Sequence, residues 1–481
     1  MSTAQRVARN TASLAAVQGF RIVAALAITL YIARFGAAWL GKYALLLAYL
    51  NIFQILADFG LPRLVTREVA RAPAAGNRYF WNALAAQLTL SAASMLLMLA
   101  AVALIGYPAD TTRMLQVATL AIPPYALASV AGALLQAHER MAALALAEGV
   151  STLWQLVGSI WLLSAGYGVV ALAWVRVVGV LLSGLVNLIS MRRVTHPGRP
   201  AVSPHFALAL AHGSLDLFIL AAFGAILFRL DVLVLTEVAG EAATGVYNAA
   251  YQLAKVVALL SLAYADAIFP TLSRLYAAGE TAEQTGNGQA DWVLRKSFAW
   301  SAAVLLPLAV GATILPAPVI GLLYPQAEFA AAVTVLPWLG WMLLPYFAYV
   351  ILNRALVAAN LQRVARDTTV IMVLVGVGLQ YGLARWQGVT GTAIATTLTF
   401  LLGAALNAFF VRRALGTLHL GRAFGRALPA ALGLSAVLAL LRAWPLWVSL
   451  PAGALSYAGL AFMTRAFTRE DLALVRKMIG R

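Results

Sequence analysis

Residues 41–71 read GKYALLLAYLNIFQILADFGLPRLVTREVAR. The first half of this stretch is apolar and, with the residues before it, reaches the roughly 20 residues that a membrane-spanning helix needs. The second half contains Asp58 and then three arginines. A basic segment directly after an apolar run is typical of a helix end that faces the cytoplasm. We therefore predict a membrane-spanning helix over residues 39–62.

The composition extends this interpretation to the whole chain. Of its 481 residues, 62% are hydrophobic and only 11% are charged, and the mean hydropathy is +0.86. Since soluble domains carry roughly 25% charged residues, the composition excludes a soluble enzyme, a disordered protein and a nucleic-acid-binding protein. The chain has no cysteine, and its five histidines lack the spacing of a metal site, so we expect no bound metal and no cofactor.

We predict an all-α integral membrane protein with fourteen transmembrane helices, with ends uncertain by about three residues. The predicted helices are 12–34, 39–62, 80–105, 114–137, 141–164, 168–190, 209–235, 245–270, 298–323, 331–358, 368–386, 388–411, 424–442 and 445–466. Pro123 and Pro124 are expected to interrupt the fourth helix, and Pro337 and Pro345 the tenth.

The basic residues predict the orientation. With this helix assignment, about five times as many Lys and Arg residues lie on the side of the N-terminus as on the other side. Basic residues accumulate on the cytoplasmic side of membrane proteins. Both termini are therefore expected to be cytoplasmic, and the basic clusters need no partner beyond the lipids of the inner leaflet.

The chain contains an internal repeat. Gly168 and Asn187 match Gly388 and Asn407 at one constant offset of 220 residues, and the pair Arg192-Arg193 matches Arg412-Arg413 at the same offset. The Gly41 and Asp58 ends of the second helix likewise match the Gly245 and Asp266 ends of the eighth. The repeat predicts two pseudo-symmetric six-helix lobes, residues 1–200 and 201–415, followed by a helix pair and a cytoplasmic tail, residues 416–481. In such an arrangement a substrate site lies between the lobes.

Ionisable residues inside the predicted spans are the strongest functional signal, because they are costly in hydrocarbon and usually face a wet cavity or the bundle interior. The candidate substrate-binding cations are Arg21, Arg229, Lys255, Arg176 and Arg354. Arginine binds phosphate in a bidentate manner and keeps its charge, so such a set suits a diphosphate that crosses the membrane. The alternative interpretation is a set of buried Arg–Asp pairs that hold helices together.

Acidic and neutral polar residues supply further candidates. Asp58, Asp216 and Asp231 could couple transport to a H⁺ or Na⁺ gradient, or serve as counter-ions to arginine. Amide and aromatic side chains could contact a glycan, and the tyrosines among them could instead be interfacial anchors. These candidates are Gln18, Asn51, Gln54, Tyr43, Tyr247, Tyr251 and Gln252.

The pattern of Gly41, Tyr43 and Asn51, followed by DFGL at 58–61 and RE-x-AR at 67–71, resembles the Wzx-type polysaccharide and O-antigen flippases. These belong to the multidrug/oligosaccharidyl-lipid/polysaccharide (MOP) exporter superfamily. The resemblance implies the MATE-like fourteen-helix fold with two lobes. It implies alternating-access transport of an undecaprenyl-diphosphate-linked oligosaccharide from the cytoplasmic to the periplasmic leaflet for O-antigen or exopolysaccharide synthesis, and a functional cation at Arg21.

Other functions remain open at this point. A lipid II flippase also carries a polyprenyl diphosphate, and a multidrug/cation antiporter shares the architecture. A membrane glycan polymerase or ligase would need paired carboxylates or histidine at an accessible surface, which the short outer loops lack, so we expect no enzyme. The excess of Arg over Lys and the abundance of Ala suggest a GC-rich bacterial genome. The resemblance implies a bacterial inner membrane, with a polysaccharide polymerase and other assembly proteins as partners.

Overall fold

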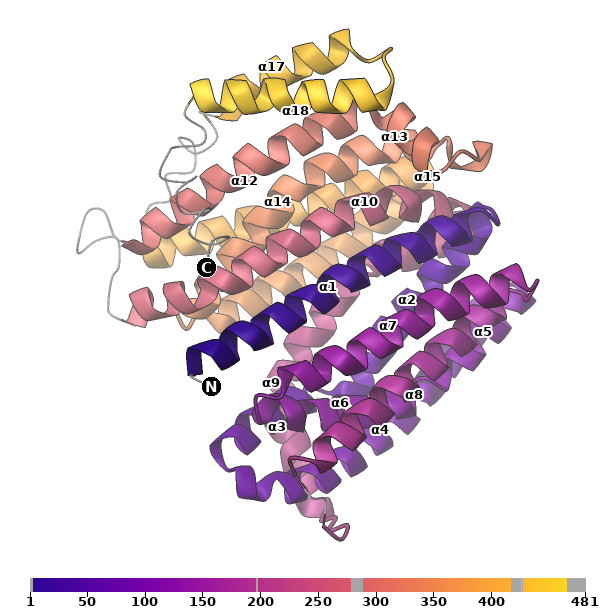
Figure 1. Cartoon of the computed structure of the whole chain (residues 1–481), viewed down its shortest axis with the longest axis vertical. Helices are drawn as coiled ribbons and strands as arrows, with labels where there is room; N and C mark the ends of the chain where they lie inside the picture. Colours follow the sequence, from indigo (N-terminus) through magenta and orange to yellow (C-terminus); the bar gives the residue numbers. More distant parts are fainter. Residues whose placement is uncertain (1–2, 196–197, 278–288, 417–424, 426, 465–481) are drawn as a thin grey trace. The chain divides into compact units, whose positions relative to one another are not determined.

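The structure is a computed structural model that describes residues 3–195, 198–277, 289–416, 425 and 427–464. Within these ranges every regular element is a helix (Figure 1). In chain order they are α1 (Thr3–Ala33), α2 (Ala37–Asp58), α3 (Leu61–Arg71), η1 (Pro73–Ala75), α4 (Gly76–Ile105), α5 (Ala109–Thr119), α6 (Ile122–Ala137), α7 (Met141–Ser164), α8 (Val170–Arg192), α9 (Pro204–Leu227), α10 (Leu230–Ala277), α12 (Gln289–Ile314), α13 (Pro316–Leu323), η2 (Ala327–Phe329), α14 (Ala332–Ala358), α15 (Gln362–Leu415), α17 (Ala427–Leu440) and α18 (Leu446–Met463).

The helices confirm an all-α, multi-pass membrane protein. In the described part of the chain, 11 helices are long and apolar enough to cross a membrane, or 12 if the bent helix α9 is one span. The 54 residues of α15 are broken at Gly388, where φ is 56° and ψ is −126°. At 1.5 Å per residue they would be about 80 Å long, more than twice the hydrocarbon thickness. The break therefore divides α15 into two passes, and the total of fourteen stays a prediction.

The chain divides into two compact units, residues 1–237 and 238–481. The first unit contains α1 to α9 and the start of α10, and the second contains the rest of α10 and all later helices. Helix α9 packs against α2, α3 and α4 and thus belongs to the first unit by its contacts. The predicted lobe boundaries at 200/201 and 415/416 rest on the sequence repeat, and they remain predictions. The tail at 465–481 lies outside the described residues.

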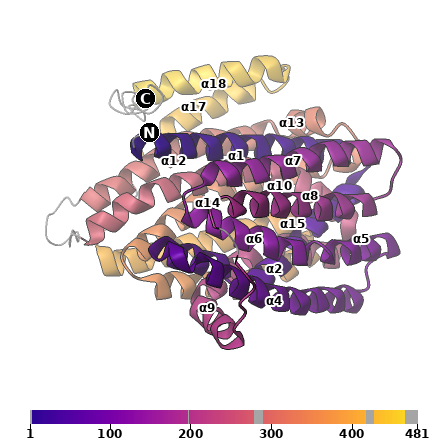
Figure 2. The same ribbon diagram turned by 60° about the horizontal axis from the view of Figure 1, so that its bottom comes forward.

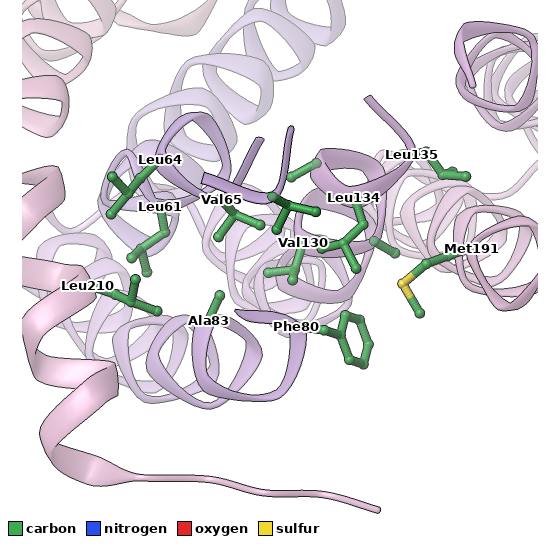
Figure 3. Packing of buried hydrophobic residues seen from close by; sticks show 13 residues of the cluster. Leu61, Leu64, Val65, Phe80, Ala83, Val130, Leu134, Leu135, Met191 and Leu210 are labelled. Atoms are coloured by element: carbon green, nitrogen blue, oxygen red, sulfur yellow. The ribbon is translucent and has the colours of Figure 1, made fainter. Parts of the chain in front are cut away.

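The first unit has a core at the end where α3 lies. One face of α3 buries Leu61, Leu64 and Val65 against α4 and α6 (Figure 3). The opposite face carries exposed arginines, two of which flank and pair with Glu68. This amphipathic helix was missing from the prediction, because it is too short and too charged to register as a span.

The second unit is built around α12, α14 and α15. Helices α17 and α18 form a hairpin that packs on α12 (Figure 2). The Tyr457 hydroxyl donates a 2.7 Å hydrogen bond to the Ala303 carbonyl oxygen of α12. The prediction that Pro337 and Pro345 interrupt this region was wrong, since α14 runs unbroken through both; in contrast, α5 ends shortly before Pro123 and Pro124, as expected.

Equivalent contacts in the two units support the internal repeat. Asn187 Nδ2 of α8 donates to the Ala128 carbonyl of α6 at 3.0 Å. Asn407 Nδ2 of α15 donates to the Tyr349 carbonyl of α14 at 3.3 Å. The donors are 220 residues apart, so the residues that matched in sequence make the same side-chain-to-backbone bond in each unit.

Candidate functional site

Arg176 is the centre of a charged cluster in the first unit. It lies on α8, is partly buried, and donates a hydrogen bond from Nη1 to Gln155 Oε1 on α7. It interacts electrostatically with Tyr43, Arg229, Arg21 and Glu148. Three of the five predicted cations, from three separate segments of the chain, therefore lie within electrostatic reach of one another.

Arg21 forms the ion pair of this cluster. Its Nη1 lies 3.3 Å from Glu148 Oε2, and 48% of each side chain is exposed. Both residues lie inside candidate membrane spans, 16–33 and 141–164. Because half-exposed charges at such positions are costly against lipid tails, they are expected to face a water-filled space. The pair is thus open to exchange with an anionic ligand.

Arg229 occupies a break between helices. Helix α9 ends at Leu227 and α10 begins at Leu230, and the Arg229 amide donates to Ile226 in a tight turn. Broken helices inside a membrane are tolerated where the chain lines a cavity or packs on protein. Asp231 is buried, and its carboxylate accepts a 2.8 Å bond from the Val232 amide at the start of α10, where the helix dipole favours a negative charge.

A row of polar side chains on α7 connects the members of the cluster. Glu148, Ser151 and Gln155 are spaced at i, i+3 and i+7 and share one helix face. Ser151 and Gln155 lie against Gly179 of α8, where an added Cβ would lie 3.2 Å and 3.3 Å from their side chains. The rise from Glu148 to Gln155 is about 10 Å. The row therefore connects two depths of the membrane, one with the Arg21 ion pair and one with Arg176.

The DFGL motif forms a sharp turn that contacts α9. Phe59 and Gly60 both have left-handed conformations, with φ of 49° and 73°, and they end α2. The Phe59 ring stacks on Phe218 at a centroid distance of 4.2 Å. A Cβ on Gly60 would lie 3.0 Å from backbone atoms of Ser214 and Phe218. This contact lies where α9 bends by 55°, and the side chain of Asp216 at that bend lies outside the described residues.

Asp58 holds three helices together at the same turn. Its Oδ1 accepts hydrogen bonds from Gln87 Nε2 of α4 at 2.7 Å and from Ser129 Oγ of α6 at 2.9 Å. Asp58 thus links α2 to α4 and α6 by hydrogen bonds, a structural role that the sequence alone did not reveal. A role for it in ion coupling stays a prediction.

Replacing Asp58 by alanine should lower the stability of the protein by about 1–3 kcal/mol, because Gln87 and Ser129 lose their acceptor. Replacing it by asparagine keeps one acceptor oxygen and should cost less. Thermal unfolding in detergent measures both variants. An alanine variant as stable as the wild type would show that these bonds contribute nothing.

In the second unit, Arg354 is ion-paired. Its Nε and Nη2 lie 2.9 Å and 2.8 Å from Asp266 Oδ1. Arg354 therefore fits the alternative interpretation of the candidate cations, because its ion pair with Asp266 joins α14 to α10. Lys255 is partly buried on α10, and its place beside the first-unit cations stays a prediction.

The predicted glycan contacts differ in exposure. Gln18 is exposed on α1, and Asn51 and Gln54 are partly buried on α2. The remaining four residues, Tyr43, Tyr247, Tyr251 and Gln252, are buried.

Tyr247 and Tyr251 stack on each other at 5.6 Å, and the Tyr247 hydroxyl lies 3.2 Å from Thr396 Oγ1. Burial does not fit interfacial anchors, which was the alternative for the tyrosines. Contact with a glycan stays a prediction for all seven residues.

Sequence reasoning missed two members of the cluster as site residues, Glu148 and Gln155. Their signal was the i, i+7 spacing on one face of α7, together with Ser151 between them. The partner helix that turns this face into a site could not be read from the sequence.

Comparisons with known proteins cover more than half of the chain. The model of the family described as polysaccharide biosynthesis protein matches residues 7–276. A relative from Haloferax volcanii, the "Probable low-salt glycan biosynthesis flippase Agl15", is 24% identical over 389 residues, which cover 80% of this chain and 79% of the relative. The "Probable flippase AglR" of the same organism is 24% identical over 271 residues, 55% of each chain.

Solved structures share the fold. The lipid II flippase MurJ in an inward closed conformation has a TM-score of 0.69 at 16% identity, covering 94% of this chain and 99% of its own. An inward-facing multidrug resistance MATE transporter of the MOP superfamily has a TM-score of 0.67 at 15% identity, covering 84% and 96%. The fold of this chain is therefore that of the MOP superfamily.

Proposed function

Because the chain belongs to the polysaccharide biosynthesis protein family, we propose that it is a flippase for a polyprenyl-diphosphate-linked oligosaccharide used in surface polysaccharide assembly. The observation that carries the proposal is the cluster of Arg21, Arg176 and Arg229 within segments of the first unit that cross or adjoin the membrane. Guanidinium groups bind phosphate oxygens in a bidentate manner and remain charged at all physiological pH values.

The charges of the cluster suit this cargo. Three guanidinium groups and the Glu148 carboxylate sum to a net charge of +2. A diphosphate that links a sugar to a lipid is a diester and carries two negative charges. The barrier to flipping is the transfer of this charged head group through hydrocarbon, and the cluster replaces the water around it with arginine and amide groups.

We also propose a direction of transport and a membrane for this protein. The head group enters from the cytoplasmic leaflet and leaves toward the periplasmic leaflet by alternating access, while the polyprenyl tail stays in lipid. We propose undecaprenyl as the lipid, O-antigen or exopolysaccharide as the polymer, a polysaccharide polymerase as a partner, and a bacterial inner membrane with cytoplasmic termini. We further propose that a H⁺ or Na⁺ gradient drives the cycle.

Reconstitution tests the proposal. The purified protein is inserted into liposomes that contain a polyprenyl-diphosphate-linked oligosaccharide in one leaflet, and the appearance of glycan in the other leaflet is measured with a lectin. Imposed H⁺ and Na⁺ gradients identify the coupling ion. Translocation no faster than in protein-free liposomes under every gradient would refute the flippase function.

Two other functions fit the same fold and are separated by their substrates. A lipid II flippase would move lipid II in the same liposomes, and deletion of the gene would be lethal rather than remove a surface polymer. A multidrug/cation antiporter binds cations, and the net positive charge around Arg176 disfavours it.

A further inference from the structure

Glu148 is the one carboxylate that interacts with Arg176 electrostatically among the described residues, and it also pairs with Arg21. It lies on the same face of α7 as Gln155, which accepts the hydrogen bond of Arg176. Glu148 is therefore paired with Arg21 and also lies near Arg176. No described carboxylate comes within ion-pair distance of Arg176. The position of Glu148 at one end of the polar row on α7 suggests that it helps an anionic ligand to move, rather than that it joins two helices.

The Arg21–Glu148 contact is suited to exchange. The distance of 3.3 Å belongs to one nitrogen and one oxygen, and both side chains are 48% exposed. A phosphate can offer Arg21 two oxygens in place of one. An incoming phosphate therefore competes well with Glu148, whereas a buried bidentate pair would resist displacement.

The second arginine site lies farther along α7. Gln155 is about 10 Å of helix rise from Glu148 on α7, and it accepts the hydrogen bond of Arg176 from α8. Arg229 interacts with Arg176 and Tyr43. Two anion positions thus follow one another along the row, the first at Arg21 and the second at Arg176 and Arg229. When an anion leaves the first position, Arg21 can form its ion pair with Glu148 again.

We propose that Glu148 is the residue that releases the substrate head group from Arg21: it competes with the diphosphate for the guanidinium and re-forms the ion pair as the head group moves on to Arg176 and Arg229. This inference rests on the proposed flippase function. It assigns Glu148 a part in transport as a competing anion that sets the residence time of the substrate at the first position.

The test compares binding and translocation in Glu148→Gln. The probe is a polyprenyl diphosphate without sugar, titrated against the full-length protein in nanodiscs of zwitterionic lipid. Loss of the competitor should tighten binding about two- to fivefold, the range expected for removal of a partly exposed ion pair. Translocation in liposomes should slow, since the head group leaves Arg21 less readily. Glu148→Asp should restore the rate at least in part.

Glu68→Gln is the matched control, because Glu68 pairs with Arg67 and Arg71 on α3, outside the cluster. It should leave binding and translocation unchanged. If Glu148→Gln binds the probe as the wild type does, or more weakly, Glu148 is a structural partner of Arg21 and the inference is wrong, while the flippase function stands. If the wild type itself does not bind the probe and does not flip the lipid-linked oligosaccharide, the proposed function fails first.

Discussion

Replacing Arg229 or Arg21 by alanine is expected to reduce translocation of the lipid-linked oligosaccharide by a factor on the order of ten to a hundred. A charge-assisted hydrogen bond contributes roughly 1.5–3 kcal/mol, and each variant removes one guanidinium from a cluster of three. The effect should be largest for Arg229, because Glu148 pairs with Arg21 and offsets part of its charge. The measurement is the rate of glycan appearance in the opposite leaflet of proteoliposomes.

Arg113→Ala provides the control for this prediction. Arg113 is an exposed arginine of α5 in the same unit, and its removal changes the net charge by the same amount. It should translocate substrate at the wild-type rate. Wild-type rates in both Arg229→Ala and Arg21→Ala, at normal levels of inserted protein, would contradict the assignment of the cluster.

Replacing Gly60 by alanine should destabilise the protein by about 2–5 kcal/mol. The left-handed conformation at φ 73° costs an L-residue roughly 1–2 kcal/mol, and the added Cβ would lie 3.0 Å from backbone atoms of α9. Overpacking against atoms that cannot rotate away adds about 1–3 kcal/mol. The measurement is the shift of the thermal unfolding midpoint in detergent.

Gly106→Ala separates the two contributions to this loss. Gly106 has nearly the same φ, 74°, but no atom within 4 Å of the position of an added Cβ. It should show only the conformational part. Equal destabilisation by Gly60→Ala and Gly106→Ala would mean that the close contact between the DFGL turn and α9 does not add to the loss of stability.

Much of the fold could be predicted because membrane helices leave a direct mark in the sequence. The apolar run of α7, for example, was predicted at 141–164 and is observed at Met141–Ser164. Asn187 and Asn407 matched by their spacing, and they make equivalent bonds. The amphipathic helix α3 was not predicted, because its 11 residues are too few and too charged to register as a membrane span.

The site could be predicted only in part, since ionisable residues in spans indicate a polar interior without saying which of them meet. Arg21, Arg176 and Arg229 come together within the first unit, whereas Arg354 proves to be paired with Asp266. The predicted helix 209–235 places Arg229 inside a continuous span, whereas the structure has a break there, between Leu227 and Leu230. That break depends on packing between helices, which the local sequence does not reveal.

If the first-unit arginines bind the diphosphate head group, as we propose, an equilibrium binding measurement detects this contact without the need for translocation. Polyprenyl diphosphate and polyprenyl monophosphate are titrated against wild type, Arg176→Ala, Arg229→Ala and the control Arg113→Ala in zwitterionic nanodiscs. Wild type and Arg113→Ala should bind the diphosphate at least about tenfold more tightly than the monophosphate, and the Arg176 and Arg229 variants should lose this preference. Equal affinity for the two lipids in the wild type, or an unchanged preference in the cluster variants, would contradict this binding role.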